Sequence, residues 1–157
     1  MVESMKIGIV VHSITGNTLS VAQKIKEELS ADGHTISLEQ VAAVDEKQAQ
    51  KGKVQLKDIP DVSAYDILIF GAPVHAFSLS QVMKAFLTNA ELSRDKKVFC
   101  YVTQSFPFSW LGGNRAIRQM REICESKGST VIGTGVVMWK RLNRRKQIDD
   151  LAKKVKN

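Results

Sequence analysis

The sequence predicts an α/β fold built on a mostly parallel sheet of five strands. Short apolar runs rich in β-branched residues alternate with longer segments in which apolar residues recur at steps of three or four positions. This alternation is typical of strands and helices that take turns along an α/β chain. The length of 157 residues suits one compact domain, so we expect residues 1–157 to form a single unit.

The predicted strands are short and bounded by polar residues or glycine. Because a parallel strand is buried on both faces, it is expected to be a continuous apolar run instead of an alternating one. The runs that meet this expectation are residues 7–11, 36–38, 67–70, 98–102 and 131–138.

The predicted helices are amphipathic and separate most of these strands. Their apolar residues define one face of each helix, and the segments are 19–29, 82–90, 115–127 and 148–155. Asn143 is a candidate N-cap for the last helix. Arg144, Arg145 and Lys146 crowd its first turn, where cations oppose the helix dipole. Residues 41–58, rich in Gln, Lys and Asp, predict either one poor helix or a loop.

Composition and charge exclude several classes of protein. With 43% hydrophobic and 25% charged residues, the chain is neither disordered nor fibrous. The net charge of +7 favours acidic partners or nucleic acid. Cys100 and Cys124 lack the spacing of a zinc or iron–sulfur site, and we predict no metal site. The apolar run near the N-terminus is too short for a signal peptide or a membrane span, so we expect a cytoplasmic protein.

The first strand is followed by residues 12–18, a segment whose chemistry suits a phosphate monoester. Hydroxyl and amide side chains offer neutral donors there, Gly16 permits a tight turn, and the first N–H groups of a helix face the anion. The segment lacks the Lys of a P-loop, the three glycines of a dinucleotide fingerprint and the Cys and Arg of a cysteine phosphatase. A helix cap alone is the other interpretation of this segment.

The run Ser13-Ile14-Thr15-Gly16-Asn17-Thr18 resembles the phosphate loop of the flavodoxin family. Residues 65–74 and 98–113 are similar to the third and fourth strands of that family and to the loops that border its flavin. The resemblance covers residues 6–155. It implies a flavodoxin-like three-layer sandwich, with parallel strands in the order 2-1-3-4-5 and non-covalently bound FMN at the topological switch point.

The resemblance also implies which residues contact FMN. In the first loop they are Ser13, Ile14, Thr15, Gly16, Asn17 and Thr18. In the second loop they are Pro73, Val74, His75, Ala76 and Phe77, and in the third loop Thr103, Gln104, Phe106, Trp110, Gly112 and Gly113. The aromatic side chains, with Phe108, suit the flat and largely apolar isoalloxazine ring. We assign no catalytic side chain.

The other reactive side chains are expected to have structural roles. Cys100 lies inside a predicted strand and Cys124 on the apolar face of a predicted helix, so both belong in the core. We expect His34 at the surface and a structural role for His12 beside the first loop.

Two departures from the family concern the chemistry of the flavin. The loops 12–18, 73–80 and 103–115 contain no Asp or Glu, and Arg115 adds a positive charge. The reduced, anionic flavin should therefore be less destabilised than in an acidic carrier, which raises its potential. Residues 73–78 contain no glycine whose peptide could flip towards the flavin. We therefore expect two-electron chemistry with little accumulation of half-reduced flavin.

Three functional interpretations remain open. The slightly favoured one is an electron carrier that transfers electrons through FMN to an acidic redox partner protein. The second is a small FMN-dependent oxidoreductase that uses NAD(P)H or a quinone. The third is a non-redox binding module of the same fold. The basic run 140–146 is interpreted as a solvated helix face and not as a nucleic-acid site. A monomer and a homodimer are equally compatible with the sequence.

Overall fold

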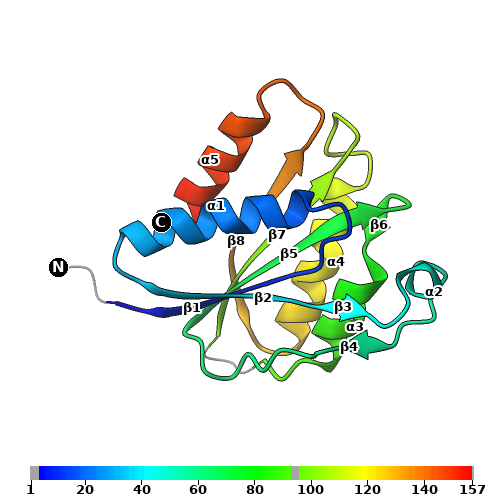
Figure 1. Cartoon of the computed structure of the whole chain (residues 1–157), viewed down its shortest axis with the longest axis horizontal. Helices are drawn as coiled ribbons and strands as arrows, with labels where there is room; N and C mark the ends of the chain where they lie inside the picture. Colours follow the sequence, from blue (N-terminus) through cyan, green and yellow to red (C-terminus); the bar gives the residue numbers. More distant parts are fainter. Residues whose placement is uncertain (1–3, 93–95, 157) are drawn as a thin grey trace.

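The computed structural model describes residues 4–92 and 96–156. Its centre is a parallel sheet in the order β2-β1-β5-β7-β8 (Figure 1). The strands are β1 (Lys6–Val11), β2 (Thr35–Gln40), β5 (Ile67–His75), β7 (Lys97–Gln104) and β8 (Thr130–Met138). Counted along the chain, this is the predicted order 2-1-3-4-5. A two-residue strand, β6 (Ser78–Leu79), pairs antiparallel with the end of β5.

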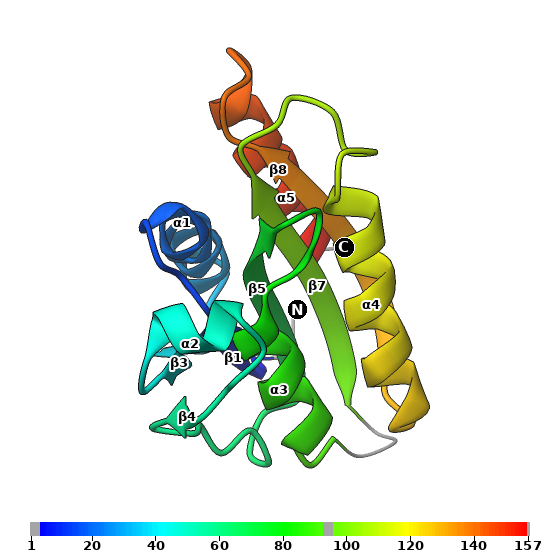
Figure 2. The same cartoon turned by 90° about the vertical axis from the view of Figure 1, so that its right-hand side faces the viewer.

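Helices cover both faces of the sheet, which confirms the three-layer sandwich. On one face lie α1 (Asn17–Ala31) and α5 (Arg144–Lys156), and on the other lie α3 (Gln81–Asn89) and α4 (Gly113–Ser126) (Figure 2). Each overlaps a predicted helix and extends it by a few residues or shifts its ends. In the part of the chain that the structure describes, none of the helices is both long and apolar enough to span a bilayer.

The core divides between the two faces because successive strand residues point to opposite sides. In β1, Ile9 and Val11 pack with α1 and α5, while Val10 packs towards α3 and α4. Cys100 and Cys124 are buried in the second of these layers as free thiols, as predicted.

The segment that the sequence left undecided contains a short helix between two short strands. Strands β3 (Ala42–Ala43) and β4 (Leu56–Lys57) pair antiparallel, and α2 (Glu46–Gln50) lies between them. Asp45 caps this helix by accepting a hydrogen bond from the N–H of Gln48 at 3.1 Å.

The contacts of Asn143 and the burial of His34 differ from what the sequence predicts. Asn143 directly precedes α5, as an N-cap would, but its side-chain oxygen accepts from the Gln147 side chain at 3.0 Å. His34 is half-buried, and its Nδ1 accepts from the N–H of Met5 at 3.2 Å.

Candidate functional site

The three predicted loops meet at one edge of the sheet, where β1, β5 and β7 end. The strand register pairs Val11 with Gly71 and Pro73 with Thr103, so the chain leaves the three strands at neighbouring points. Figure 1 shows the start of α1, β6 and the chain before α4 at this end of the molecule. This is the edge at which open parallel sheets bind their ligands.

The first loop turns into α1 at Gly16, whose φ of 92° is left-handed and suits glycine. Ser13 Oγ accepts from the N–H of Leu19 at 3.3 Å, and Ser20 Oγ donates to the carbonyl oxygen of Gly16 at 2.8 Å. Within the described residues, the N–H groups of Asn17 and Thr18 donate to no acceptor, and α1 has no side-chain cap. The helix start thus presents free donors and a positive dipole end.

Buried hydrogen bonds connect this loop to strand β7. The hydroxyl groups of Thr18 and Thr103 lie 2.8 Å apart, and the Tyr101 hydroxyl donates to the carbonyl oxygen of Thr18 at 2.8 Å. Burial raises the pKa of Tyr101, so its hydroxyl keeps the proton that it donates. These two contacts from β7 therefore fix the position of the first turn of α1.

His12 is buried beside the first loop and connects three elements. Its Nδ1 lies 2.9 Å from Ser80 Oγ, and its Nε2 lies 3.1 Å from a carboxylate oxygen of Glu46. Burial lowers the pKa of His12, against the attraction of Glu46. A neutral imidazole that donates to Glu46 and accepts from Ser80 satisfies all three groups. Since Ser80 also caps α3 through the N–H of Met83, the structural role predicted for His12 is confirmed.

The second loop is a tight hairpin between β5 and β6. Its two central residues, Ala76 and Phe77, have φ values of 49° and 61°, as a type I′ turn requires. Gln119 of α4 holds the hairpin from the side: its Oε1 accepts from Ser78 Oγ at 2.9 Å and from the N–H of Leu79 at 2.8 Å. Strand pairing and these two hydrogen bonds therefore hold the loop in a left-handed turn that it forms without glycine.

The third loop folds over the side chain of Gln104. Gln104 Nε2 donates to the carbonyl oxygens of Phe106 and Phe108 at 2.8 Å and 2.6 Å. Its Oε1 is buried and has no partner among the described residues. A buried acceptor without a donor costs free energy, so this oxygen is a candidate for contact with a ligand.

The two glycines at the start of α4, Gly112 and Gly113, let the third loop pack closely against its neighbours. A Cβ at Gly112 would lie 2.7 Å from Phe77 Cα, and a Cβ at Gly113 would lie 2.4 Å from Gln104 Oε1. The second and third loops thus approach each other at backbone distance. A contact of these glycines with flavin remains a prediction.

A cleft of about 310 Å³ lies between the second and third loops. It brings together five predicted residues and Ser105; the predicted ones are Val74, Ala76, Phe77, Gln104 and Phe106. The rings of Phe77 and Phe106 stack at 5.3 Å, and those of Phe108 and Trp110 at 5.7 Å. Since Trp110 is 70% exposed, aromatic surface is available to a flat ligand at this edge.

Four residues that support the loops escaped the sequence analysis. Tyr101 lies within an apolar strand run, Glu46 within the undecided segment, Ser80 at a helix start and Gln119 on a helix surface. A cap residue such as Ser80 can be found from its position before a helix. The contacts of the others join residues 34 to 83 positions apart, and no local pattern indicates them.

Comparisons with known proteins agree with this architecture. The chain is similar to flavodoxin 2 from Bacillus cereus (20% identity, 95% of this chain and 96% of that one covered, TM-score 0.66). It is also similar to the two-electron reduced flavodoxin of Megasphaera elsdenii (22%, 93% and 97%, 0.65). A third similar structure is a flavoprotein from Lactobacillus acidophilus in complex with FMN (18%, 95% and 99%, 0.64). A search of curated proteins found no significant match.

The comparison with protein families identifies a family as well as a fold. Residues 5–143 match the family described as NADPH-dependent FMN reductase, which is most of the chain. The description of the family names FMN, and one of the similar structures was solved in complex with FMN. The chain is therefore a flavodoxin-like flavoprotein with FMN as its cofactor, and it belongs to the NADPH-dependent FMN reductase family.

Proposed function

We propose that this protein is an oxidoreductase that takes electrons from NADPH onto FMN. The observation that carries the proposal is the family match over residues 5–143. The sequence alone slightly favours an electron carrier, whereas the family match supports the alternative of an FMN-dependent NAD(P)H oxidoreductase. A quinone or an acidic protein would then be the final acceptor.

In this proposal the first loop binds the phosphate of FMN. Thr15 is exposed and the N–H groups of Asn17 and Thr18 are free, so hydroxyl and amide donors converge on the start of α1. The Thr18 hydroxyl is buried against Thr103, and it positions the loop through that contact. Neutral donors and the helix dipole together can hold a dianion without a lysine or arginine.

The ring of FMN would lie at the cleft between the second and third loops. Phe77 and Phe106 supply apolar walls there, and Gln104 Oε1 is a buried acceptor without a donor. A flavin has a ring N–H at its polar edge, so the residues present fit the cofactor. In the same proposal, the remaining predicted residues frame this cleft; they include His75, Trp110, Gly112 and Gly113.

When bound, FMN accepts a hydride from a nicotinamide and passes the electrons to an acceptor. The chain orients the ring, excludes water from one side and sets the local charge. No carboxylate occurs in residues 12–18, 73–80 or 103–115, so the three loops themselves place no negative charge against the reduced ring. The hairpin of Ala76 and Phe77 keeps the wall of the cleft in one conformation.

The test is anaerobic mixing of the FMN-loaded protein with NADPH, with NADH as the comparison. We expect NADPH to bleach the flavin absorbance band stoichiometrically and NADH to do so more slowly. If dithionite reduces the bound flavin but neither nucleotide does, the protein is an electron carrier and the proposal fails.

A further inference from the structure

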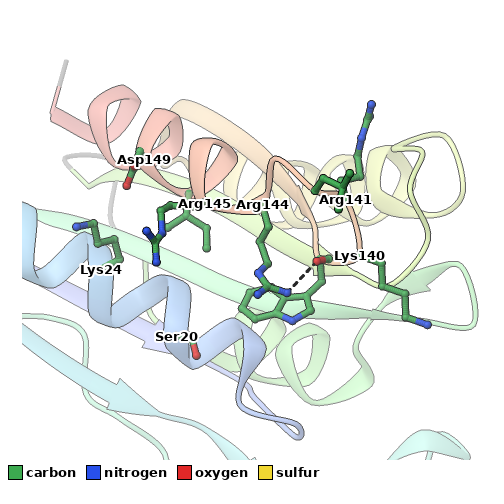
Figure 3. A pocket seen from close by; sticks show the side chains of 10 residues that line it. Ser20, Lys24, Lys140, Arg141, Arg144, Arg145 and Asp149 are labelled. Carbon is green, nitrogen blue, oxygen red and sulfur yellow. Dashed lines mark hydrogen bonds between the residues drawn. The ribbon is translucent and has the colours of Figure 1, made fainter.

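A second cavity lies between α1 and the connection from β8 to α5 (Figure 3). Its volume is about 870 Å³, larger than that of the cleft between the aromatic loops. Five of its lining residues are cationic and one is a carboxylate, Asp149; the cations are Lys24, Lys140, Arg141, Arg144 and Arg145. The basic run that we interpret from sequence as a solvated helix face thus forms one wall of a concave site.

Most of this positive charge is not neutralised. Lys24 pairs with Glu28 at 3.4 Å. In the part of the chain that the structure describes, the four cations from residues 140–145 form no ion pair with a carboxylate. Figure 3 shows the side chains of Lys24, from α1, and Arg145, from α5, extending into the space between the two helices. Clustered cations in a concave site attract an anion, and a phosphate monoester matches the planar donors of arginine.

The same cavity has an aromatic wall. Trp139 is half-buried against the core, and the guanidinium of Arg144 lies 4.6 Å from the centroid of its ring. Arg144 also donates to the carbonyl oxygen of Trp139 at 3.2 Å, so the stack is fixed. An indole with a guanidinium on it offers flat, polarizable surface of the kind on which nucleobases stack.

The cavity also borders the FMN site on two sides. Ser20 lines it and bonds the carbonyl oxygen of Gly16 in the first loop. On the other side, Arg141 reaches the carbonyl oxygen of Pro107 at 3.4 Å, and the N–H of Trp139 donates to the carbonyl oxygen of Gln104 at 2.8 Å. A dinucleotide bound here would have its far end beside the flavin.

We propose that this cavity binds the adenosine 2′-phosphate half of NADPH, with the 2′-phosphate between Lys24 and Arg145 and the adenine at Trp139 and Arg144. The proposal rests on the proposed function and adds the site that distinguishes NADPH from NADH. In Rossmann-type dinucleotide sites, an arginine beside the ribose accommodates the 2′-phosphate. The family match ends at residue 143. Arg144 and Arg145 lie beyond it, so the match does not include these two cations of the cavity.

The experiment is calorimetric titration of the oxidised, FMN-loaded protein with 2′,5′-ADP, which carries the 2′-phosphate but cannot donate a hydride. We expect 5′-AMP and inorganic phosphate each to bind about tenfold more weakly or worse, because each lacks part of the ligand. Arg145→Gln and Lys24→Gln should each weaken 2′,5′-ADP binding about tenfold. The matched control is Lys146→Gln, since Lys146 is in the same turn of α5 but does not line the cavity.

Several results would overturn the assignment. Equal binding of 2′,5′-ADP and 5′-AMP, or equal losses in Lys146→Gln and Arg145→Gln, would mean that only general charge attracts the ligand. Binding of a DNA duplex without binding of 2′,5′-ADP would assign the basic face to nucleic acid. If NADPH bleaches the flavin and Arg145→Gln leaves its KM unchanged, the cavity assignment fails while the proposed function stands. If 2′,5′-ADP binds as expected but NADPH leaves the flavin oxidised, the proposed function alone fails.

Discussion

At the residue scale, the first loop separates hydroxyl groups that can meet a ligand from hydroxyl groups that hold the fold. Thr15 is exposed, whereas the Thr18 hydroxyl is buried 2.8 Å from that of Thr103. The two threonines are three positions apart and belong to the same motif. Their tasks differ because α1 turns Thr18 towards β7.

Thr15→Ala should therefore weaken FMN binding by about 1.5–3 kcal/mol, the contribution of a hydrogen bond to a charged group. Titration of the apoprotein with FMN, followed by quenching of flavin fluorescence, measures the change. Thr15→Ser should restore most of the affinity. Thr88→Ala, which removes a hydroxyl from the far end of α3, should have no effect. Unchanged affinity in Thr15→Ala would mean that the phosphate lies elsewhere.

His12 makes the stability of the fold dependent on pH. Burial lowers its pKa from 6.5, and burial together with His12 lowers the pKa of His75, whose ring lies 6.2 Å away. Glu46 opposes both shifts. Below pH 6.5 the unfolded chain binds more protons than the folded one, so stability is full above that value and falls as pH drops towards the lowered pKa values.

Urea unfolding at a series of pH values from about 8 to about 5 should show this loss. His12→Gln should flatten the dependence in part, and the double variant with His75→Gln should flatten it further. A wild-type profile with no slope below pH 6.5 would contradict the assignment of a lowered pKa to His12.

At the scale of elements, the β5–β6 hairpin carries backbone strain next to the cleft. Ala76 and Phe77 both occupy the left-handed region, which disfavours residues with a Cβ. Strand pairing on either side and the Gln119 side chain hold them there. Strain of this kind persists where the surrounding structure requires one conformation.

Ala76→Gly should consequently raise the free energy of unfolding by about 0.5–1 kcal/mol, since glycine adopts this φ without a steric cost. Chemical denaturation of the two proteins tests it. The matched control, Ala85→Gly within α3, should lower stability by about 1 kcal/mol because glycine is a poor helix residue. Destabilisation by both substitutions would show that the turn is not strained at position 76.

At the scale of the whole molecule, charge separates this protein from acidic electron carriers. The chain carries a net charge of +7, and no carboxylate occurs in the three loops that frame the FMN site. Loops without carboxylates destabilise the anionic, fully reduced flavin less than acidic loops would. The hairpin, in turn, lacks a glycine whose peptide could turn to stabilise a half-reduced ring.

Stepwise reduction with dithionite should therefore pass from oxidised to fully reduced flavin with little long-wavelength absorbance at the midpoint. The visible spectrum recorded through the titration is the measurement. A large long-wavelength band at half reduction would contradict this prediction and favour one-electron chemistry.

Local patterns in the sequence determined the order of the elements, the parallel sheet and the three loops at its carboxyl edge. Apolar runs and helical periods are properties of neighbouring residues, and the first loop is a contiguous motif, so both can be recognised without coordinates. Tertiary structure alone decided which hydroxyl groups are free, which glycines serve packing, and that His12 bonds to Glu46 and Ser80. Tertiary structure also places the cations of residues 140–145 in one wall of a cavity, because α1 contributes the other wall from more than a hundred positions away. The residues in such contacts are far apart in the sequence and meet only when the chain folds. A pattern among neighbouring residues therefore cannot predict them.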